Sequence, residues 1–297
     1  MSVEDELGAP DPTSRVEPLK TVPKAYDDRG RLREVISDPL NLLIERVHDA
    51  GVVRDGLVTL HNGVRVPIKG PGAYYGDHSH LLVFNRGVFE PLEEFLFQEM
   101  LKRIGERPVM LELGAYWAHY SLWLKRLRPK ARTIMVESER ENLLAGRKNF
   151  KRYGFKGEFI QAFVDEGQFE VDAFMQAQGI EHLDVLHSDI QGYEIPMLAG
   201  ASKLLERHAV DYVFISTHKQ KRHWRVRNRL EKHGYRIEVS SDVDSETTSY
   251  DGLVFATRPE IPPLIAPFDP LGRDRINRST AAQLVDYLAS IRARLEG

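Results

Sequence analysis

Short apolar runs alternate with amphipathic stretches along the middle of the chain. Seven runs have the length and apolar content of buried strands: 109–113, 133–137, 158–162, 183–187, 211–216, 235–240 and 252–257. Stretches typical of helices separate the first six, near 117–127, 139–153, 170–178, 194–206 and 223–233. Buried strands joined by helices are typical of parallel sheets, so the pattern predicts a doubly wound α/β fold. Only "SDVDSETTSYD" separates the last two runs, which are therefore expected to close the sheet as an antiparallel hairpin.

The region before this alternation predicts an arm, a helix and a hairpin. Residues 1–36 are rich in Pro, Asp, Arg and Glu and lack periodic apolar residues, so we expect a mobile or loosely docked arm. The stretch "DPLNLLIERVHDAG" (38–51) has helical periodicity, a capping aspartate, a proline in its first turn and a terminal glycine. In "LVTLHNGVRVPI" (57–68), apolar and polar residues alternate around an Asn-Gly pair, which predicts a β-hairpin.

Two further helices are expected beside the sheet. "EPLEEFLFQEMLKRIG" (90–105) has one apolar face and ends at a glycine. "TAAQLVDYLASIRARL" (280–295) begins with a capping box formed by Thr280 and Gln283, and we expect it to pack outside the sheet or against a second copy of the chain. The predicted organisation is an arm at 1–36, a helix and hairpin cap region at 37–105, the main domain at 106–260, and a linker with a helix at 261–297.

Composition narrows the class of protein without identifying it. The 297 residues, 42% of them hydrophobic, suffice for one large core with an appended segment. A net charge of −3 gives no reason to expect nucleic acid or an anionic membrane as a partner. The absence of cysteine excludes disulfides, thiolate metal sites and cysteine nucleophiles. The acidic start and the lack of any apolar run near ~20 residues predict a cytoplasmic protein without a membrane span.

The end of the first predicted strand carries the first candidate chemistry. It reads "LELGAYWAHYSLW" (111–123), and ligands of open parallel sheets bind at such carboxyl ends. Gly114 would let the backbone approach a ligand, and the second strand ends in Glu137, which is placed to accept two ribose hydroxyls. A dinucleotide fingerprint requires three glycines, and only one is present, so a ribose without a pyrophosphate is expected. S-adenosylmethionine has a ribose and no pyrophosphate, and Glu112 could pair with its ammonium. The alternative is that Glu112 and Glu137 are ordinary strand-end carboxylates that face water.

Four stretches resemble successive motifs of the FkbM-type methyltransferases. They are "GVFEPLEEFLFQEML", "LELGAYWAHYSLW", "VESERENLLAGRKNF" and "LDVLHSDIQGYEIPMLAGA", and the resemblance runs from about 85 to 257. It implies a Rossmann-like, seven-stranded class I methyltransferase sheet that uses S-adenosylmethionine to methylate hydroxyl oxygens. The family motifs are matched at Glu112, Gly114, Ala115, Glu137, Asp189, Gly192 and Glu194.

The chain also departs from these motifs. Tyr116 stands in place of Asn, Ser138 in place of Pro, and His187 with Gln191 in place of Lys and Glu. By the resemblance, the turn at 114–116 faces the methionine end of the cofactor, and Ala162 and Phe163 flank the adenine. The cofactor-binding residues expected in this way are Glu112, Gly114, Ala115, Tyr116, Ser121, Glu137, Ser138, Ala162 and Phe163.

Histidines and carboxylates follow the fourth and fifth strands. Neighbouring strand ends are expected to bring His187, Asp189 and His218 together. In one interpretation a histidine is the general base that removes the hydroxyl proton. In another, Asp189, His218 and His187 or Glu194 hold Mg, Mn, Fe or Zn, which acidifies the hydroxyl. In a third, the histidines only line the pocket and Asp189 caps the next helix. The candidate catalytic residues are His187, Asp189, Glu194 and His218.

Two further stretches bear on the acceptor. "HKQKRHWRVRNR" (218–229) either grips an anionic substrate or is a solvated helix face, and "YYGDHSH" (74–80) is a candidate lid. The sequence thus predicts an O-methyltransferase acting on a hydroxyl of a sugar, a glycan or a small secondary metabolite. A nicotinamide-dependent reductase and a non-catalytic S-adenosylmethionine-binding partner subunit are the alternatives.

Overall fold

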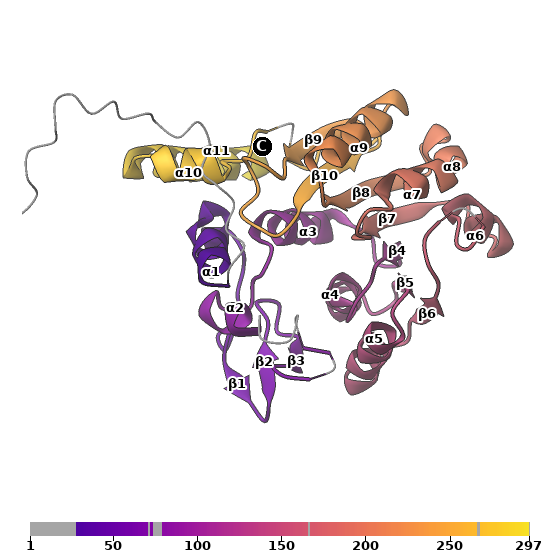
Figure 1. Ribbon diagram of the computed structural model, residues 1–297, viewed down its shortest axis with the longest axis horizontal. Coiled ribbons are helices and arrows are strands. Elements are labelled where there is room, and N and C mark those ends of the chain that lie inside the picture. Colours follow the sequence, from indigo (N-terminus) through magenta and orange to yellow (C-terminus); the bar gives the residue numbers. More distant parts are fainter. Residues whose placement is uncertain (1–27, 71, 74–78, 166, 266–267, 297) are drawn as a thin grey trace, which may run out of the picture.

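A seven-stranded sheet forms the centre of the protein (Figure 1). The computed structural model describes residues 28–70, 72–73, 79–165, 167–265 and 268–296. The strands are β4 (Val109–Leu113), β5 (Arg132–Glu137), β6 (Glu158–Gln161), β7 (Leu183–Ser188), β8 (Val210–Thr217), β9 (Arg236–Ser241) and β10 (Gly252–Thr257). Their order is β6-β5-β4-β7-β8-β10-β9, and only β10 is antiparallel to its neighbours. This is the class I methyltransferase sheet, and each predicted run differs from its strand by at most one residue at either end.

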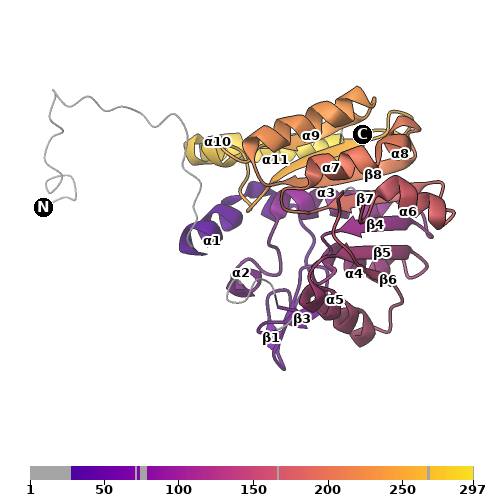
Figure 2. The same ribbon diagram turned by 45° about the vertical axis from the view of Figure 1, so that its right-hand side comes forward.

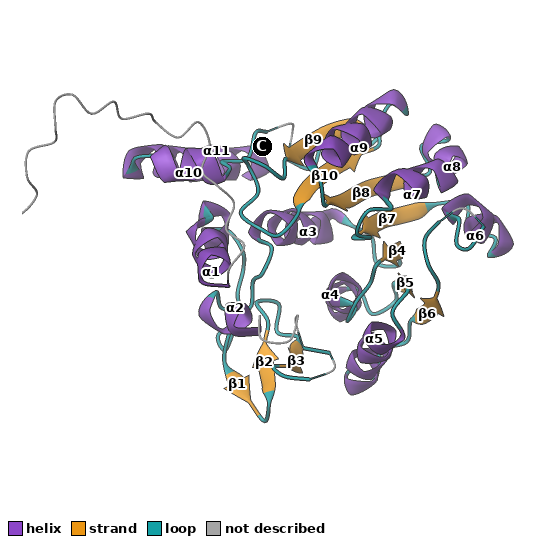
Figure 3. Cartoon of the chain, viewed as in Figure 1, coloured by secondary structure: helices purple, strands orange, loops and turns teal. Residues whose placement is uncertain are grey.

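Helices cover both faces of the sheet (Figure 3). Alternate strand positions explain this, because Leu111 and Leu113 pack on one face whereas Met110 packs on the other. The first face is covered by α6 (Val171–Ala177), α7 (Glu194–Gly200), α8 (Ser202–Glu206) and α9 (Gln220–Lys232). The second is covered by α3 (Pro91–Arg103) and α4 (His119–Leu127), while α5 (Arg140–Arg152) packs at the β5–β6 edge. The helix predicted at 194–206 is divided in two at Ala201.

The predicted helix at 38–51 is wrong beyond its first turn. Asp38 does cap the short 3-10 helix η2 (Pro39–Leu42), where its carboxylate accepts a hydrogen bond from Leu40 N at 2.8 Å. After η2 the backbone bonds to other elements: Gln98 Oε1 accepts from Glu45 N at 2.7 Å, and Val47 N donates to His61 O at 2.9 Å. Tertiary partners for the backbone therefore replace the helical ladder that the periodicity predicted.

Part of the predicted arm is a docked helix. Helix α1 (Asp28–Ser37) buries Arg31 and Val35, and the rest of the arm, 1–27, lies outside the described residues. Figures 1 and 2 place α1, α2 (Ser79–Phe84) and a small antiparallel sheet together on one side of the main sheet. That sheet consists of β1 (Val53–Arg54), β2 (Leu57–Thr59) and β3 (Arg65–Pro67), and the β2–β3 pair confirms the predicted hairpin.

The C-terminal helix follows its prediction, whereas the predicted linker before it contains a further short helix. It contains α10 (Arg273–Arg278) and α11 (Ala281–Glu296). The capping box forms as predicted, because Thr280 N donates to Gln283 Oε1 at 2.8 Å and Gln283 N donates to Thr280 Oγ1 at 3.3 Å. Ile291 packs into the core that α3 and α4 share with the sheet. Within the described ranges, no helix combines the length and apolar character needed to cross a bilayer.

One buried histidine links stability to pH. His223 of α9 is fully buried, with Nδ1 2.9 Å from Thr217 Oγ1 and Nε2 2.8 Å from Ser240 Oγ. Burial lowers its pKa from 6.5 to about 4, so the ring stays neutral in the folded state while the unfolded chain takes up a proton below pH 6.5.

We therefore expect His223 to lower the free energy of unfolding by about 2 kcal/mol between pH 7 and pH 5. The loss grows as the pH falls towards 4, and the contribution is fully present above 6.5. Urea unfolding at several pH values, with His223→Gln as the comparison, measures it. Parallel pH curves for the two proteins would contradict the assignment.

Candidate active site

A cavity of about 1230 Å³ opens at the carboxyl ends of β4, β5, β7 and β8. This volume exceeds what one drug-sized ligand needs, so a cofactor and an acceptor have room side by side. The predicted site residues that line it are Glu112, Gly114, Ala115, Tyr116, Glu137, Ser138, Ala162, Phe163, His187, Asp189 and His218. Ser121 and Glu194 are not among the described lining residues, and both are fully buried behind the cavity wall.

The turn after β4 has an unusual backbone. Gly114, Tyr116 and Ala118 all have positive φ, at 72°, 45° and 64°. Gly114 was expected to admit a ligand, and the structure shows a second need for glycine. A Cβ at this position would lie 1.9 Å from Asp189 O, because the loop after β7 crosses directly over the turn. The turn after β4 and the loop after β7 are therefore held in close contact.

Glu137 at the end of β5 is anchored on both sides. Its Oε2 accepts a hydrogen bond from Tyr116 N at 2.8 Å, and its Oε1 accepts one from Glu139 N at 2.9 Å. The Tyr116 hydroxyl in turn donates to Ala73 O at 2.8 Å, which ties the turn to the N-terminal region. A carboxylate has about four acceptor positions, so Glu137 can still accept hydroxyls from the cavity.

Glu112 lies deeper in the same wall. It is 2% exposed, and Ser121 N donates to its Oε2 at 3.2 Å. Burial raises the pKa of Glu112, and the neighbouring His187 opposes that rise. Ser121, predicted to bind the cofactor, thus positions Glu112 through its backbone.

His187 is paired with a residue that the sequence did not suggest. Its Nε2 lies 2.5 Å from Glu93 Oε1 on α3, and Ser216 Oγ donates to Glu93 Oε2 at 3.1 Å. Burial lowers the pKa of His187, but Glu93, together with Glu112 and Asp189, raises it by more, so that the net shift is upward. His187 lines the same cavity as Asp189 and His218, as predicted, but its ring is hydrogen-bonded to Glu93 and not to either of them.

His218 is surrounded by carboxylates. Nδ1 lies 2.9 Å from Glu194 Oε1, whereas Nε2 lies 3.0 Å from Asp189 Oδ1 and 3.5 Å from Asp251 Oδ1. Burial lowers its pKa, but these carboxylates dominate and raise the pKa of His218 to about 10. His218 is therefore an imidazolium at neutral pH, which argues against the prediction that it is the general base.

Glu194 and Asp251 complete this cluster. Glu194 also accepts from His218 N at 3.3 Å and lies 3.8 Å from Arg222 Nε, so it orients His218 from behind. Asp251 precedes β10 and was not predicted, because the sequence did not show that β10 pairs with β8, the strand that leads to His218.

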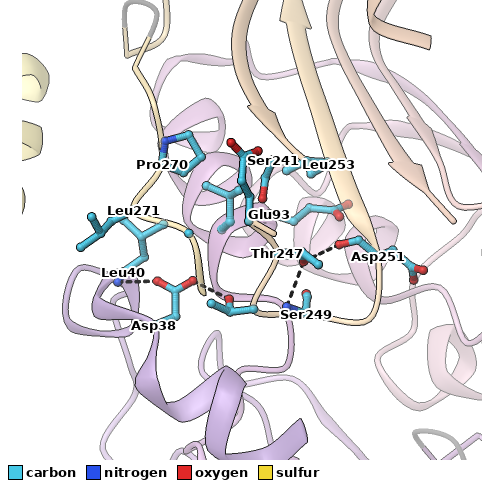
Figure 4. Close-up of a pocket in the computed structure, with 14 residues that line it drawn as sticks. Asp38, Leu40, Glu93, Ser241, Thr247, Ser249, Asp251, Leu253, Pro270 and Leu271 are labelled. Atoms are coloured by element: carbon cyan, nitrogen blue, oxygen red, sulfur yellow. Dashed lines mark hydrogen bonds between the residues drawn. The ribbon is translucent and has the colours of Figure 1, made fainter. Parts of the chain in front are cut away.

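The loop that carries Asp251 is held by a hydroxyl network (Figure 4). Thr247 Oγ1 donates to Asp251 O at 2.6 Å, and Thr248 Oγ1 donates to Asp38 Oδ2 at 2.6 Å. Burial raises the pKa of Asp38 to about 6, and its hydrogen bonds to Thr248 and Leu40 limit that rise. Asp38, which caps η2, thus also holds in place the loop between β9 and β10 (242–251), which we call the acidic loop.

Aromatic and basic residues line the remaining walls. Phe163 and Tyr193 meet edge to face with ring centroids 4.4 Å apart. Arg31, Lys219 and Arg222 line the cavity from α1 and from the start of α9. Of the candidate lid at 74–80, residues 74–78 lie outside the described residues.

Comparison with known proteins agrees with this geometry. A family model described as "Methyltransferase FkbM domain" matches residues 72–237, more than half of the chain. No curated protein matches the sequence.

Several solved structures are similar to this chain at low identity. Methyltransferase FkbM from Methylobacillus flagellatus KT is 18% identical, with a TM-score of 0.42, over 52% of this chain and 44% of that one. Precorrin-6y C5,15-methyltransferase from Geobacter metallireducens GS-15 is also 18% identical, with a TM-score of 0.41, over 55% of this chain and 85% of that one. Ribosomal protein L11 methylase from Lactobacillus delbrueckii subsp. bulgaricus is 12% identical, with a TM-score of 0.43, over 66% of this chain and 84% of that one. By its sequence match and its sheet topology, the chain belongs to the FkbM methyltransferase family.

Proposed function

We propose that this protein is an S-adenosylmethionine-dependent O-methyltransferase that acts on a hydroxyl of a sugar, a glycan or a small secondary metabolite in the cytoplasm. One observation carries the proposal. A single cavity joins the anchored Glu137 and the turn after β4 to the cluster of Asp189, His218 and Asp251. A methyl donor on the first side and a hydroxyl on the second would then meet in line.

The cofactor would lie along the ends of β4, β5 and β6. Glu137 would accept the ribose hydroxyls, and Glu112 would lie near the ammonium of the methionine end. Ala162 and Phe163 would flank the adenine, and Tyr193, whose ring meets that of Phe163 edge to face, also lines the cavity.

We assign Asp189 as the group that accepts the proton of the acceptor hydroxyl. Its backbone packs on Gly114, and its N–H donates to Leu113 O at 2.9 Å, so it lies directly beside the donor turn. Bound S-adenosylmethionine would supply the methyl group, and the Asp189 carboxylate would take the proton of the acceptor hydroxyl as its oxygen is methylated. The products would be a methyl ether and S-adenosylhomocysteine.

A divalent cation is the alternative occupant of this cluster. Asp189, His218 and Asp251 offer ligand atoms within 4.8 Å of one another, so Asp251, not the predicted His187, would be the third ligand. A cation would have to displace the proton that His218 shares with the carboxylates. Activity that persists after chelation favours the proton-transfer role, and activity restored only by added Mg²⁺ or Mn²⁺ favours the cation.

The basic lining residues favour an acidic acceptor. Arg31 stacks on the Tyr250 ring at 3.5 Å, and Lys219 and Arg222 also line the cavity. We therefore expect acceptors that carry a carboxylate or a phosphate, such as acidic sugars or sugar nucleotides, and not a nucleic acid chain.

A panel of hydroxyl compounds tests the proposal. The full chain is incubated with S-adenosylmethionine and with matched pairs of acidic and neutral sugars, sugar nucleotides and small alcohols. We expect formation of S-adenosylhomocysteine together with a methyl ether, located by mass spectrometry. Cofactor binding without transfer to any acceptor would support the alternative of a non-catalytic subunit.

Replacement of Glu137 by glutamine should weaken cofactor binding by about 10- to 100-fold, because charge-assisted hydrogen bonds to the ribose are lost. Isothermal titration with S-adenosylhomocysteine measures the change. Glu141→Gln is the control, since Glu141 is exposed in the first turn of α5 and does not line the cavity. Equal affinities for the two variants would place the ribose elsewhere.

A further inference from the structure

A second group of ligating side chains lies beneath the active-site turn. His61 lies in the turn between β2 and β3, Glu94 on α3, and His119 at the start of α4. They are 1%, 0% and 5% exposed, and their ligand atoms all lie within 4.8 Å of one another. Three segments that are distant in sequence thus bring two imidazoles and one carboxylate to a single buried point.

The two ring nitrogens of His119 are buried without a hydrogen bond to the described residues. Neither Nδ1 nor Nε2 has a hydrogen-bond partner within the described part of the chain, although the residue is buried. A buried polar group without a partner is costly and points to an ion or a ligand at that place. The ring also lines the main cavity, so solvent can reach it.

The other two residues are held in orientations suited to ligation. Glu94 Oε1 accepts from Phe89 N at 2.8 Å and from Glu90 N at 2.9 Å, which leaves Oε2 directed at His61 Nε2, 2.7 Å away. His61 Nδ1 faces Glu45 O at 3.4 Å. A histidine that donates from one nitrogen to a carbonyl and offers the other is the usual arrangement of a metal ligand.

The rings around the group are apolar. Phe89, Trp117 and Tyr120 lie 4.8, 5.1 and 4.7 Å from the His119 ring, and the Trp123 ring lies 4.4 Å from that of His61. Such a shell lowers the local dielectric and strengthens the bonds of a charged ion to its ligands.

We propose that His61, Glu94 and His119 form a binding site for a divalent transition-metal ion of the zinc type, with solvent from the cavity as the fourth ligand. Two imidazoles, one carboxylate and an open position suit zinc and its neighbours. Bond lengths of about 2.0–2.2 Å set tetrahedral ligand atoms about 3.4 Å apart. His61 Nε2 and Glu94 Oε2, now 2.7 Å apart, must therefore separate slightly, whereas any separation near the 4.8 Å limit of the group must shorten.

The position of this site suggests what the ion does. His119 directly follows Ala118, the last residue with positive φ in the turn after β4. The ion would tie that turn to α3 and to the β2–β3 hairpin. Its binding is therefore expected to raise the melting temperature of the full chain and to order the donor side of the cavity, whichever acceptor is used.

Metal binding by the wild-type chain gives a test without mutations. The protein is purified without a histidine tag, freed of metal with a chelator, and titrated with Zn²⁺. We expect one tightly bound ion per chain, and X-ray absorption should show two imidazole ligands. The other two candidate groups among the described residues, Asp189–His218–Asp251 and His182–Asp184–Asp211, hold one histidine each. A single imidazole, or no bound ion, would overturn the proposal.

Variants locate the ion independently. Titration with Co²⁺, followed by visible absorption, should give at least about tenfold weaker binding for His119→Phe, which keeps an aromatic ring in place. Asp251→Asn and His182→Gln, one in each of the other groups, should bind as the wild type does. Unchanged binding by a folded His119→Phe variant, or loss in either control, would contradict the site. If His119→Phe does not unfold cooperatively, the imidazole count of the wild type decides.

Discussion

Replacing Gly114 by alanine should lower the free energy of unfolding by at least about 3 kcal/mol. The added Cβ would lie 1.9 Å from Asp189 O and 2.7 Å from Asp189 C, and backbone atoms cannot turn away as a flexible side chain can. The φ of 72° adds further strain. Urea unfolding measures the loss, and cofactor binding should weaken with it because the turn must separate from the loop after β7.

Gly154→Ala is the matched control for the strain alone. Gly154 has a φ of 67°, and a Cβ there would meet nothing within 4 Å. It should cost only about 1 kcal/mol, the usual penalty of a left-handed backbone. If both substitutions cost the same, the close contact between the turn and Asp189 would not exist in solution.

Replacing Asp189 by asparagine should reduce turnover by about 100- to 1000-fold, the scale of a lost proton acceptor. The amide keeps the shape of the carboxylate but cannot take the hydroxyl proton. Cofactor affinity should change by no more than a few-fold, because Asp189 faces the acceptor side. Steady-state rates with an acceptor found in the panel, together with titration of S-adenosylhomocysteine, separate the two effects.

Asp244→Asn controls for the loss of a nearby negative charge. Asp244 is exposed, belongs to the same acidic loop as Asp251, and does not line the cavity. Its replacement should leave turnover within about twofold of the wild type, since exposed charges are screened by solvent. A normal rate for Asp189→Asn would reassign the proton to Asp251 or to solvent.

The sheet was predictable because its strands are buried on both faces. Continuous apolar runs such as 109–113 and 211–216 leave no other interpretation once helices separate them. The helix at 38–51 failed for the opposite reason. Its periodicity was genuine, but Gln98 and His61 offered the backbone hydrogen bonds that a local pattern does not reveal.

The site was predictable only where it follows strand ends. Glu137, Asp189 and His218 stand at such ends and line the cavity as expected. Glu93 and Asp251 reach the same place from a helix face and a loop, and neither position marks a site in the sequence. The sequence grouped Asp189 and Glu194 with His218 but did not suggest Asp251, and the three carboxylates together change the expected role of His218 from a base to a fixed cation.

Titration of the full chain with S-adenosylhomocysteine, and separately with NADH, tests the central claim most directly. The account predicts one S-adenosylhomocysteine bound per chain, loss of most of that affinity in Glu137→Gln, and no binding of NADH. Binding of NADH without S-adenosylhomocysteine would contradict the account and support the reductase alternative.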